Sequence, residues 1–474
     1  MNRRDFMRRT AGGAAMGLPL AEAAQAQAPS GPETQSLTPL DLKTLPVFCA
    51  HEHWGSIDSI GTSEEGYRAD TEAGALPSRE TSVWDLVLDP YFGGFLRAAG
   101  ADPLALARAA GAKDFLVWWQ RAPESALSGM RPHLEAQALT GAFQCIRRGI
   151  QQLYGADIGT FELEAWRRAD ASVSKAYADV HAWYRAAMEQ THLSEVVRPV
   201  HPEFYVRKGS DASARAELAF THSILRIDPL LHLEARHCPR REGLAAMVGV
   251  EPRDARSWRA FLDKLFNLAA ANGSVGIKQL QAYGRSLDFA VRSEAEIRWR
   301  GALTREQTIA LQDWIVHECC KQAHERGWAH QVHVGTHNLE QSSPLPLGAL
   351  AERYPKMNIV MLHCWPFLSE SGWLAKRHPN VYIDTCWQAV LNPAFYRRSL
   401  AEWLGYVPAH KIMCSQDATS VEMAAGSSLF VREILGESLR FHGDGLLGEA
   451  EVMGIAQRLL HNNAVRLYRV GTEA

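Results

Sequence analysis

Beyond residue 190, short runs of β-branched and other apolar residues alternate along the chain with longer stretches of helical periodicity. Such alternation is typical of parallel α/β architecture, in which each helix carries the chain back to the start of the next strand. One earlier run completes a set of eight, the number of strands that closes a (β/α)₈ barrel. The predicted strands are residues 46–50, 195–200, 223–228, 275–280, 329–334, 358–363, 381–385 and 411–415. The predicted fold class is therefore α/β, an eight-stranded TIM barrel.

The first two predicted strands are separated by about 145 residues, far more than the connection within a βα unit needs. Residues 55–192 are helical in pattern and rich in Trp, Arg and Ala, which predicts a large helical insertion after strand one. The insertion follows the carboxyl end of a strand, where the active sites of such barrels lie. We hypothesise that it forms a cap that supplies substrate contacts. The alternative is a helical addition remote from the mouth of the barrel.

The N-terminus has the features of a twin-arginine export signal. Arg3 and Arg4 precede a spacer and two apolar residues, and a weakly apolar stretch rich in Ala and Gly follows. Ala24 and Ala26 have the spacing that signal peptidase requires. The predicted parts are a signal peptide over 1–26, a leader over 27–45 and a barrel over 46–474, with the cap at 55–192. We expect export to the periplasm by the twin-arginine machinery; a basic amphipathic helix is the alternative.

Composition argues against several other kinds of protein. The 474 residues are 46% hydrophobic and 22% charged, which is ordinary for a soluble globular chain. A formal net charge of −3, without long runs of one sign, argues against a nucleic-acid partner. No segment after the signal peptide approaches the ~20 apolar residues of a membrane span, so no stable membrane anchor is expected. The eight cysteines lack the spacing of a disulfide framework, and we expect them to be reduced.

The first predicted strand ends in a pair of histidines, His51 and His53. Side chains two residues apart on a strand point the same way, so both imidazoles can face the barrel axis at its carboxyl end. Two neutral imidazoles on one side of a strand end provide half of a metal site. A His-x-His pair alone is also compatible with ordinary polar histidines in a loop.

Other candidate ligands fall at equivalent positions. His333 ends the fifth predicted strand, His363 ends the sixth, and Asp417 follows the eighth. Residues at the carboxyl ends of barrel strands converge on one pocket. Four histidines and one aspartate at such positions predict a metal site.

This order of ligands, His-x-His, His, His and Asp, resembles the amidohydrolase superfamily. The nearest branch is the second amidohydrolase family, which includes barrel domains joined to glutamine-synthetase-like domains in nodulin-type proteins. The resemblance covers strand one and nearly everything from about residue 193 to the end, whereas the insertion has no counterpart in it. The supporting motifs are GIK at 276–278, AYGRSL at 282–287, LHCWPF at 362–367, VYID at 381–384 and NAVRLY at 463–468.

The resemblance implies roles for these residues. His51, His53, His333 and Asp417 would hold a divalent metal ion, and zinc is the ion we expect, because imidazole and carboxylate ligands suit it. The metal would lower the pKa of a bound water, and Asp417 would take its proton and later deliver it to the leaving group. His363 would either bind a second metal or polarise the carbonyl under attack.

Lys278 lies in the fourth predicted strand, where binuclear members of the superfamily have a carboxylated lysine that bridges two metals. Without carboxylation, its ammonium could orient an acidic substrate or pair with Asp417. A structural salt bridge is the third interpretation. We expect one metal, because the resembling branch is generally mononuclear, and two if Lys278 is carboxylated.

The predicted substrate contacts follow strand ends. Tyr283 and Arg285 could grip a carboxylate, the arginine with two hydrogen bonds, or Arg285 could form a buried ion pair that holds its loop. Trp54 and Trp365, like Trp387, could wall the pocket or could pack under the cap. His337 follows His333 closely enough to contribute to the pocket.

The function that we expect is metal-dependent hydrolysis of a C–N (amide-type) or ester bond in a small molecule, with a carboxylate substrate as one option. Barrels with similar ligands also carry out non-oxidative decarboxylation and sugar-acid isomerisation, and these remain the alternative. A non-catalytic barrel that binds a ligand is a second alternative.

Overall fold

The computed structural model describes residues 40–54, 80–207, 219–232 and 239–471. These residues belong to one compact unit that begins at Thr38. The predicted signal peptide, most of the predicted leader and residues 55–79 of the predicted insertion lie outside the described residues.

Eight parallel strands follow one another around the sheet in the order of the sequence. They are β1 (Val47–Cys49), β2 (Leu193–Val200), β3 (His222–Arg226), β4 (Ser274–Gln279), β5 (Ala329–Gly335), β6 (Asn358–Trp365), β7 (Val381–Asp384) and β8 (Ile412–Met413). Each boundary lies within two residues of the predicted one. The predicted fold class is confirmed.

The barrel closes just beyond the carboxyl ends of its first and last strands. There the backbone N–H of Asp417 donates to the carbonyl of His51 at 3.1 Å, and the N–H of His53 donates to the carbonyl of Ala418 at 3.0 Å. The Ser415 hydroxyl also accepts from the N–H of Ala50 at 2.9 Å. Three of the residues that join the two ends of the sheet, His51, His53 and Asp417, were thus predicted to bind metal.

Alternate residues of six strands fill the interior, because successive side chains of a strand point to opposite faces. They form a hydrophobic cluster separate from the larger one that includes the surrounding helices. Leu467 and Tyr468 of α21 (Asn463–Tyr468) belong to the inner cluster and close the amino-terminal end of the barrel. Its strand members are Phe48, Ala50, Val197, Ile224, Ala329, Val360, Leu362 and Met413.

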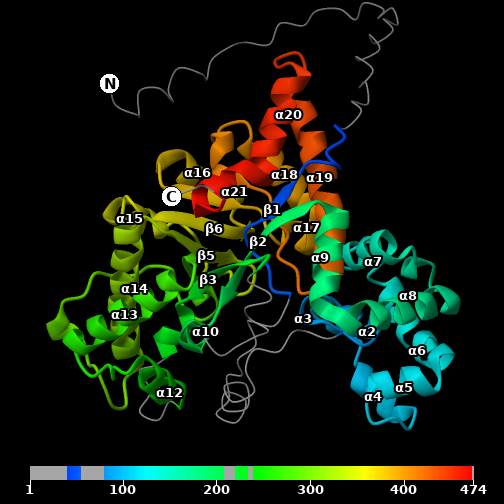
Figure 1. The fold of residues 1–474 in the computed structure, drawn as a ribbon, viewed down its shortest axis with the longest axis horizontal. Coiled ribbons are helices and arrows are strands. Elements are labelled where there is room, and N and C mark those ends of the chain that lie inside the picture. Colours follow the sequence, from blue (N-terminus) through cyan, green and yellow to red (C-terminus); the bar gives the residue numbers. More distant parts are fainter. Residues whose placement is uncertain (1–39, 55–79, 208–218, 233–238, 472–474) are drawn as a thin grey trace, which may run out of the picture. The chain divides into compact units, whose positions relative to one another are not determined.

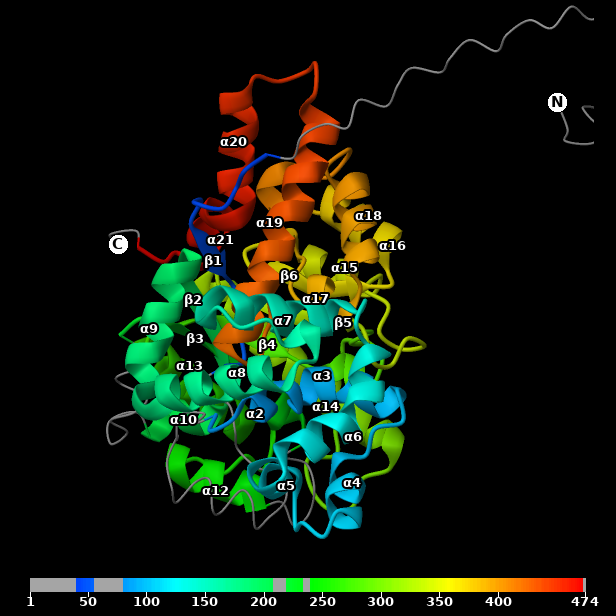
Figure 2. The same cartoon turned by 90° about the vertical axis from the view of Figure 1, so that its right-hand side faces the viewer.

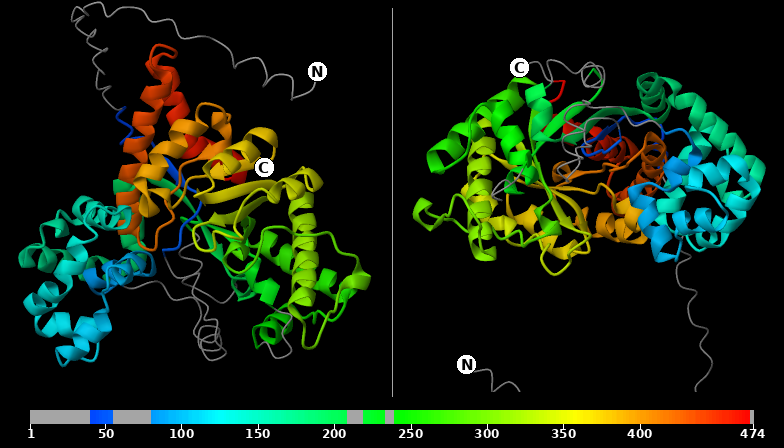
Figure 3. Two further views of the ribbon diagram at one scale, coloured as in Figure 1. Left: turned by 180° about the vertical axis from the view of Figure 1, so that it is seen from behind. Right: turned by 90° about the horizontal axis from the view of Figure 1, so that it is seen from below.

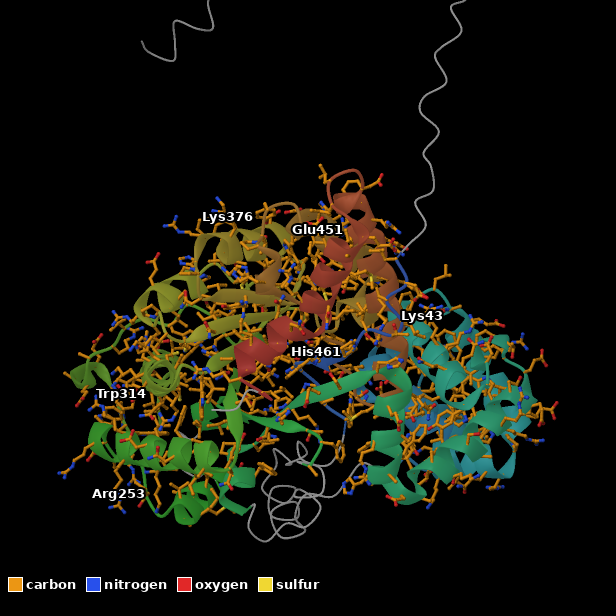
Figure 4. The ribbon with its side chains drawn as sticks, turned by 45° about the horizontal axis from the view of Figure 1, so that its top comes forward. Lys43, Arg253, Trp314, Lys376, Glu451 and His461 are labelled. Atoms are coloured by element: carbon orange, nitrogen blue, oxygen red, sulfur yellow. The ribbon has the colours of Figure 1, made fainter. Side chains whose placement is uncertain are left out.

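The connecting helices surround the sheet (Figure 1). After β2 come α10 (Pro202–Arg207), η3 (Asp228–His232), α12 (Pro239–Val248), α13 (Ala255–Ala271), η4 (Gln281–Tyr283), η5 (Glu294–Glu296), α14 (Arg305–Arg326) and α15 (Leu347–Arg353). After β6 come α16 (Leu368–Arg377), α17 (Gln388–Leu391), α18 (Pro393–Trp403), η6 (Ala409–Lys411), α19 (Val421–Gly443), α20 (Glu449–Gln457) and η7 (Arg458–Asn462). Charged side chains such as Arg253, Lys376 and Glu451 lie on the outer surface (Figure 4).

Helix α14 shows how local sequence defines these elements. Thr304 precedes it, and its hydroxyl accepts from the backbone N–H of Gln307, whose side chain accepts in turn from the N–H of Thr304. This reciprocal capping box satisfies two N–H groups that the helix itself leaves unpaired. Gly327 ends the helix with a φ of 62°, in the left-handed region that glycine enters without steric cost.

Helices fill the long connection between β1 and β2. They are α2 (Val83–Val87), α3 (Pro90–Ala98), α4 (Pro103–Ala109), α5 (Phe115–Arg121), α6 (Pro123–Glu135), α7 (Gly141–Tyr154), η1 (Ile158–Thr160), α8 (Leu163–Ala176), η2 (Tyr177–Asp179) and α9 (Val180–Thr191). We refer to α2 through α9 as the insertion. Its helices gather on the side of the barrel formed by α19 (Figures 2 and 3).

Helices α7 and α19 pack backbone to backbone at two glycines. A Cβ at Gly149 would lie 1.7 Å from the carbonyl oxygen of Glu422, and a Cβ at Gly426 would lie 1.8 Å from that of Cys145. Any side chain at either position would force the helices apart. The insertion is therefore fitted closely to the barrel.

The end of the predicted leader is packed. Leu40 and Leu42 are buried, and the Arg432 guanidinium on α19 donates to the carbonyls of Leu42 at 3.0 Å and Leu45 at 2.9 Å. The packed unit thus begins before residue 46.

Two further expectations from the sequence concern the cysteines and membrane-spanning helices. The seven cysteines in the described ranges are free and buried, as expected. Within those ranges, the structure has no helix that is long and apolar enough to cross a membrane.

Candidate metal centre

Three of the predicted ligands meet at the carboxyl end of the barrel. One atom each from His51, His53 and Asp417 lies within 4.8 Å of the others. The Asp417 carboxylate connects them: its Oδ2 lies 3.8 Å from Nε2 of His51, and its Oδ1 lies 3.7 Å from Nε2 of His53. The strand ends therefore converge as the sequence pattern predicted.

A hydrogen-bond network selects the nitrogen that His51 presents. The Gln331 amide on β5 donates to the carbonyl of Ala50 at 2.6 Å and contacts the Tyr468 hydroxyl at 2.8 Å. Its Oε1 is then the atom that faces Nδ1 of His51, at 2.8 Å. Since Oε1 can only accept, Nδ1 has the hydrogen, and the lone pair of His51 lies on Nε2, toward Asp417. Partners of this kind orient metal-binding histidines.

His333 and His363 form the other side of the centre. Nδ1 of His363 lies 3.5 Å from Oδ2 of Asp417 and 2.9 Å from the carbonyl of Cys386. Its Nε2 lies 3.1 Å from Nδ1 of His333, whose Nε2 is 2.6 Å from the Thr336 hydroxyl. The structure thus places His333 against His363 and not within the group of His51, His53 and Asp417. A nitrogen–nitrogen distance of 3.1 Å fits a hydrogen bond and also fits two ligands of one ion.

Burial keeps these imidazoles neutral. It lowers the pKa of His51 and His333 well below the usual value, and that of His363 to about 4. Lys278 on β4 is fully buried, and its positive charge lowers the pKa of all three imidazoles further. Neutral imidazoles are the form that binds metal ions.

The backbone around the centre is strained. Eight non-glycine residues in the described ranges have a positive φ, and five of them lie in this region. Their φ values run from 58° to 67°, in the left-handed region that costs on the order of 1–3 kcal/mol for a non-glycine residue. They are Thr336, His363, Cys364, Trp387 and Asp417. Such strain persists only where the surrounding structure holds it, and it is frequent at functional sites.

The strain at His363 has a direct effect on the site. Val360 and Leu362 of β6 belong to the inner cluster, so strict alternation would turn His363 toward the outer helices. Positive φ values at His363 and Cys364 interrupt the alternation. The imidazole is thereby brought beside Asp417.

Two of the predicted substrate residues flank the centre. The Tyr283 ring lies 4.5 Å from the ring of His333 and 4.2 Å from that of His337. Trp387, at the start of α17, lies 5.5 Å from His363 and 5.8 Å from His337. These rings wall one side of the space in front of the imidazoles.

The two other tryptophans have different positions. Trp54 is fully buried, with its ring 4.9 Å from Tyr184 of the insertion and 6.0 Å from the Arg198 guanidinium, which matches packing under the cap. Trp365 is half-buried, and its backbone carbonyl accepts from the N–H of Thr336 at 2.9 Å.

Arg285 lies in a buried ion pair. Its guanidinium donates to Oδ1 of Asp313 at 2.6 Å and to the carbonyl of Asp288 at 2.9 Å, and lies over the Phe289 ring. Asp313, on α14, also accepts from Arg292 at 3.1 Å. The arrangement matches the alternative interpretation, in which Arg285 holds the loop after β4.

Sequence reasoning missed the ends of β2 and β3. The Arg226 guanidinium pairs with Asp228 at 2.9 Å and lies 3.3 Å from Nε2 of His201. Burial, and after it the Asp417 carboxylate, raise the pKa of Tyr283, whereas the charge of Arg226 lowers it, so Arg226 lies close enough to act on Tyr283 electrostatically. Ile224 belongs to the inner cluster, so alternation along β3 could have indicated that Arg226 also points inward.

Tyr91 of the insertion was also missed. Its hydroxyl donates to Oδ1 of Asp417 at 2.8 Å. The two residues are 326 positions apart, and no sequence periodicity connects them.

The donor set fits a divalent metal ion. Two imidazoles and one carboxylate, close together in a largely buried site, are ligands that zinc and similar ions prefer. His363 and the Cys386 thiol form a second group with Asp417, so that aspartate is common to both.

Sequence comparison supports one family. The family model described as amidohydrolase matches residues 219–470. Protein fluG of Emericella nidulans is 28% identical over 222 residues, a match that covers 38% of this chain and 25% of that protein. The chain thus spans about a quarter of the length of this curated relative.

Solved structures share the fold. A glucuronate isomerase from Caulobacter crescentus has a TM-score of 0.66 at 16% identity, covering 91% of this chain and 93% of its own. A uronate isomerase from Bacillus halodurans has a TM-score of 0.63 at 16% identity, covering 90% and 94%. A Lactobacillus casei protein named as a metal-dependent hydrolase has a TM-score of 0.57 at 17% identity, covering 90% and 96%. Because the family model matches more than half of its length, this chain belongs to the amidohydrolase family.

Proposed function

We propose that this protein is a metal-dependent hydrolase that cleaves a C–N (amide-type) or ester bond in a small molecule. The observation that carries the proposal is the position of Asp417, whose carboxylate lies between two sets of imidazoles. Oδ1 faces His53, and Oδ2 faces both His51 and His363. His51, His53 and Asp417 would hold the ion, with His333 on the adjacent side, and zinc is the ion we propose.

A bound divalent ion would supply a Lewis acid and lower the pKa of a water molecule in this site. Asp417 would accept the proton of the attacking water and return it to the leaving group. We assign to His363, beside Oδ2 of Asp417, the polarisation of the carbonyl that is attacked, a role that requires a proton on Nε2 in place of its contact with His333. Lys278 contributes positive charge that favours the developing oxyanion.

The surrounding side chains support a small substrate with a carboxylate. Tyr283, His337 and Trp387 provide ring surfaces beside the imidazoles. Lys278 provides positive charge near the imidazoles, and Arg226, which is paired with Asp228, provides positive charge near Tyr283. We therefore assign carboxylate recognition to this side of the mouth and not to Arg285.

Isomerisation of a sugar acid is a second candidate function. A uronate isomerase and a glucuronate isomerase share the fold over about nine tenths of this chain, with TM-scores of 0.63 and 0.66. Non-oxidative decarboxylation uses the same kinds of ligands. The product distinguishes the three reactions: an amine or alcohol, a rearranged sugar acid, or carbon dioxide.

The experiment is metal analysis of the protein without residues 1–26, followed by incubation with amides, esters, uronates and carboxylic acids. The proposal expects about one equivalent of zinc and release of an amine or alcohol. Two equivalents would indicate a carboxylated Lys278. Turnover of a uronate without hydrolysis would replace the proposal with the isomerase, and absence of metal after reconstitution would contradict all three enzymes.

We also propose that residues 1–26 direct export through the twin-arginine machinery to the periplasm. The Arg3-Arg4 pair and the Ala24-Gln25-Ala26 site support it. A mature protein that begins at Gln27 in the periplasmic fraction is expected. Replacing both arginines with lysine should retain the unprocessed protein in the cytoplasm, and unchanged processing would contradict the proposal.

A further inference from the structure

We infer that Tyr91, which the insertion contributes, is a positioning residue that holds Asp417 in the orientation that binds metal. The inference rests on the proposed function only in assuming that the centre binds a divalent ion. It assigns to the insertion a part in the metal centre itself.

The contact is specific to one carboxylate oxygen. The Tyr91 hydroxyl donates to Oδ1 of Asp417 at 2.8 Å, whereas Nε2 of His53 is 3.7 Å from the same oxygen. Oδ2 is the atom that faces His51 and His363. A hydrogen bond to one oxygen of a carboxylate restricts its rotation, and so directs the other oxygen toward the imidazoles.

The ring of Tyr91 is itself held in place. It packs against the Trp387 ring, with 4.6 Å between centroids, and lies 6.3 Å from the ring of His53. Tyr91 is the second residue of α3, a helix that Asp89 caps by accepting from the N–H of Phe92 at 2.6 Å. The side chain therefore projects from a fixed helix start.

The same helix start is tied to the loop that contains Asp417. Asp89 accepts a hydrogen bond from the hydroxyl of Thr419, which is two residues beyond Asp417. Asp89, which caps α3, and Tyr91, its second residue, thus hold two residues of the loop between β8 and α19. Asp89 and Tyr91 are two positions apart, as are Asp417 and Thr419. The two hydrogen bonds therefore fix both the position of the loop and the direction of the Asp417 side chain.

The insertion as a whole is anchored close to this loop. Glu422, in the first turn of α19, is fully buried and accepts from Tyr154 at 2.6 Å, from Tyr177 at 2.9 Å and from Trp183 at 3.1 Å. These donors come from α7, η2 and α9, so three elements of the insertion share one carboxylate. Together with the close packing at Gly149 and Gly426, these bonds hold the insertion as a fixed wall of the site.

Zinc binding tests the inference without a known substrate. The probe is zinc alone, titrated into metal-free protein against a chelator of known affinity. Tyr91→Phe should lower zinc affinity about tenfold, the low end of the effect seen when a hydrogen-bond partner of a metal ligand is removed. Tyr154→Phe is the matched control, because it removes a hydroxyl from the same insertion and one bond to Glu422 but leaves Asp417 untouched. It should bind zinc like the unmodified protein.

A double-mutant cycle separates positioning from general loosening. In an Asp417→Ala background, Tyr91→Phe should have no further effect on zinc affinity, because the acceptor is gone. Equal zinc affinity of Tyr91→Phe and the unmodified protein would overturn the inference. The inference would also be overturned if Tyr154→Phe lost as much zinc affinity as Tyr91→Phe. It would be overturned as well if Tyr91→Phe caused the same loss of zinc affinity in the Asp417→Ala background. If the unmodified protein binds no zinc, the proposed function fails first.

Discussion

The two sides of the metal centre differ in how the rest of the protein supports them. His51 and Asp417 each form a hydrogen bond with a residue on another element: Nδ1 of His51 donates to Gln331 of β5, and Asp417 accepts from Tyr91 of α3. His333 and His363, in contrast, contact each other and use their remaining nitrogens on Thr336 and Cys386. On the first side, Nε2 of His51 is directed toward Asp417. On the second side, the facing nitrogens of His333 and His363 lie 3.1 Å from each other, and an ion would replace this contact where it is a hydrogen bond. Metal binding should therefore depend mainly on the first side.

The largest expected effect follows from removing both imidazoles of the first side. His51→Ala/His53→Ala should abolish zinc binding, because only one member of the buried ligand group remains. Elemental analysis measures this directly. His324→Ala, which changes a histidine of α14, should retain zinc. A double variant that still holds a full equivalent would show that the ion binds elsewhere.

A second large effect concerns turnover. Asp417→Asn keeps the size of the side chain but removes its capacity to take a proton, so the rate should fall by about 10³, within the range for general acid–base groups. Circular dichroism should show an unchanged fold. Rates within a factor of a few of the unmodified enzyme, measured on the first substrate identified, would contradict the role of Asp417 in proton transfer.

A smaller effect is expected from the partner of His51. Gln331→Leu removes the acceptor that fixes the hydrogen on Nδ1, and zinc affinity should fall between about 10-fold and 100-fold. Gln137→Leu removes a buried glutamine from the insertion and is the control. Competition with a chelator measures the zinc affinity of both variants. Equal zinc affinity in the two would mean that His333 and His363 dominate binding.

The smallest effect on metal binding is expected from Lys278→Met, which should leave about one equivalent of zinc in place if the site is mononuclear. In the metal-free protein, removing this positive charge should raise the pKa of His363 above about 4. The pKa of His363 in the folded protein lies below its unfolded value of about 6.5, so folding stability is lost as pH falls from about 6.5 toward 4. In the variant, the pH range over which this stability is lost should be narrower. Histidine NMR titration checks the shift; a lower pKa would contradict it.

The sequence predicted what depends on strand periodicity. His51, His53, His333, His363 and Asp417 were identified because each ends or follows an apolar run, and the ends of parallel strands converge. The same reasoning could not choose a partner for Arg285, because Asp313 lies 28 residues away on a helix and competes with any substrate. Nor could it find Tyr91, whose role depends on how a separate group of helices packs against α19.

Two further differences between the predicted and the observed site concern the direction of side chains. The direction of His363 depends on positive φ values, which nothing in an otherwise regular apolar run indicates. Trp54 follows His53 by one residue but packs against Tyr184 of the insertion. A residue that is next to a predicted ligand in the sequence is therefore not necessarily part of the site.

The closure of the barrel has a consequence for folding. The bonds that join its first and last strands involve the backbone of the ligands themselves, with His51 and Asp417 separated by 366 positions. Contacts between such distant segments form slowly, since a long loop must close before they contribute. An ion held by His51 and Asp417 would stabilise this junction, because its binding free energy would add to that of joining the two ends of the chain. Hydrogen exchange at the backbone amides of Asp417 and His53 should therefore slow when metal is supplied, and its rate would report how much of the protein has bound metal.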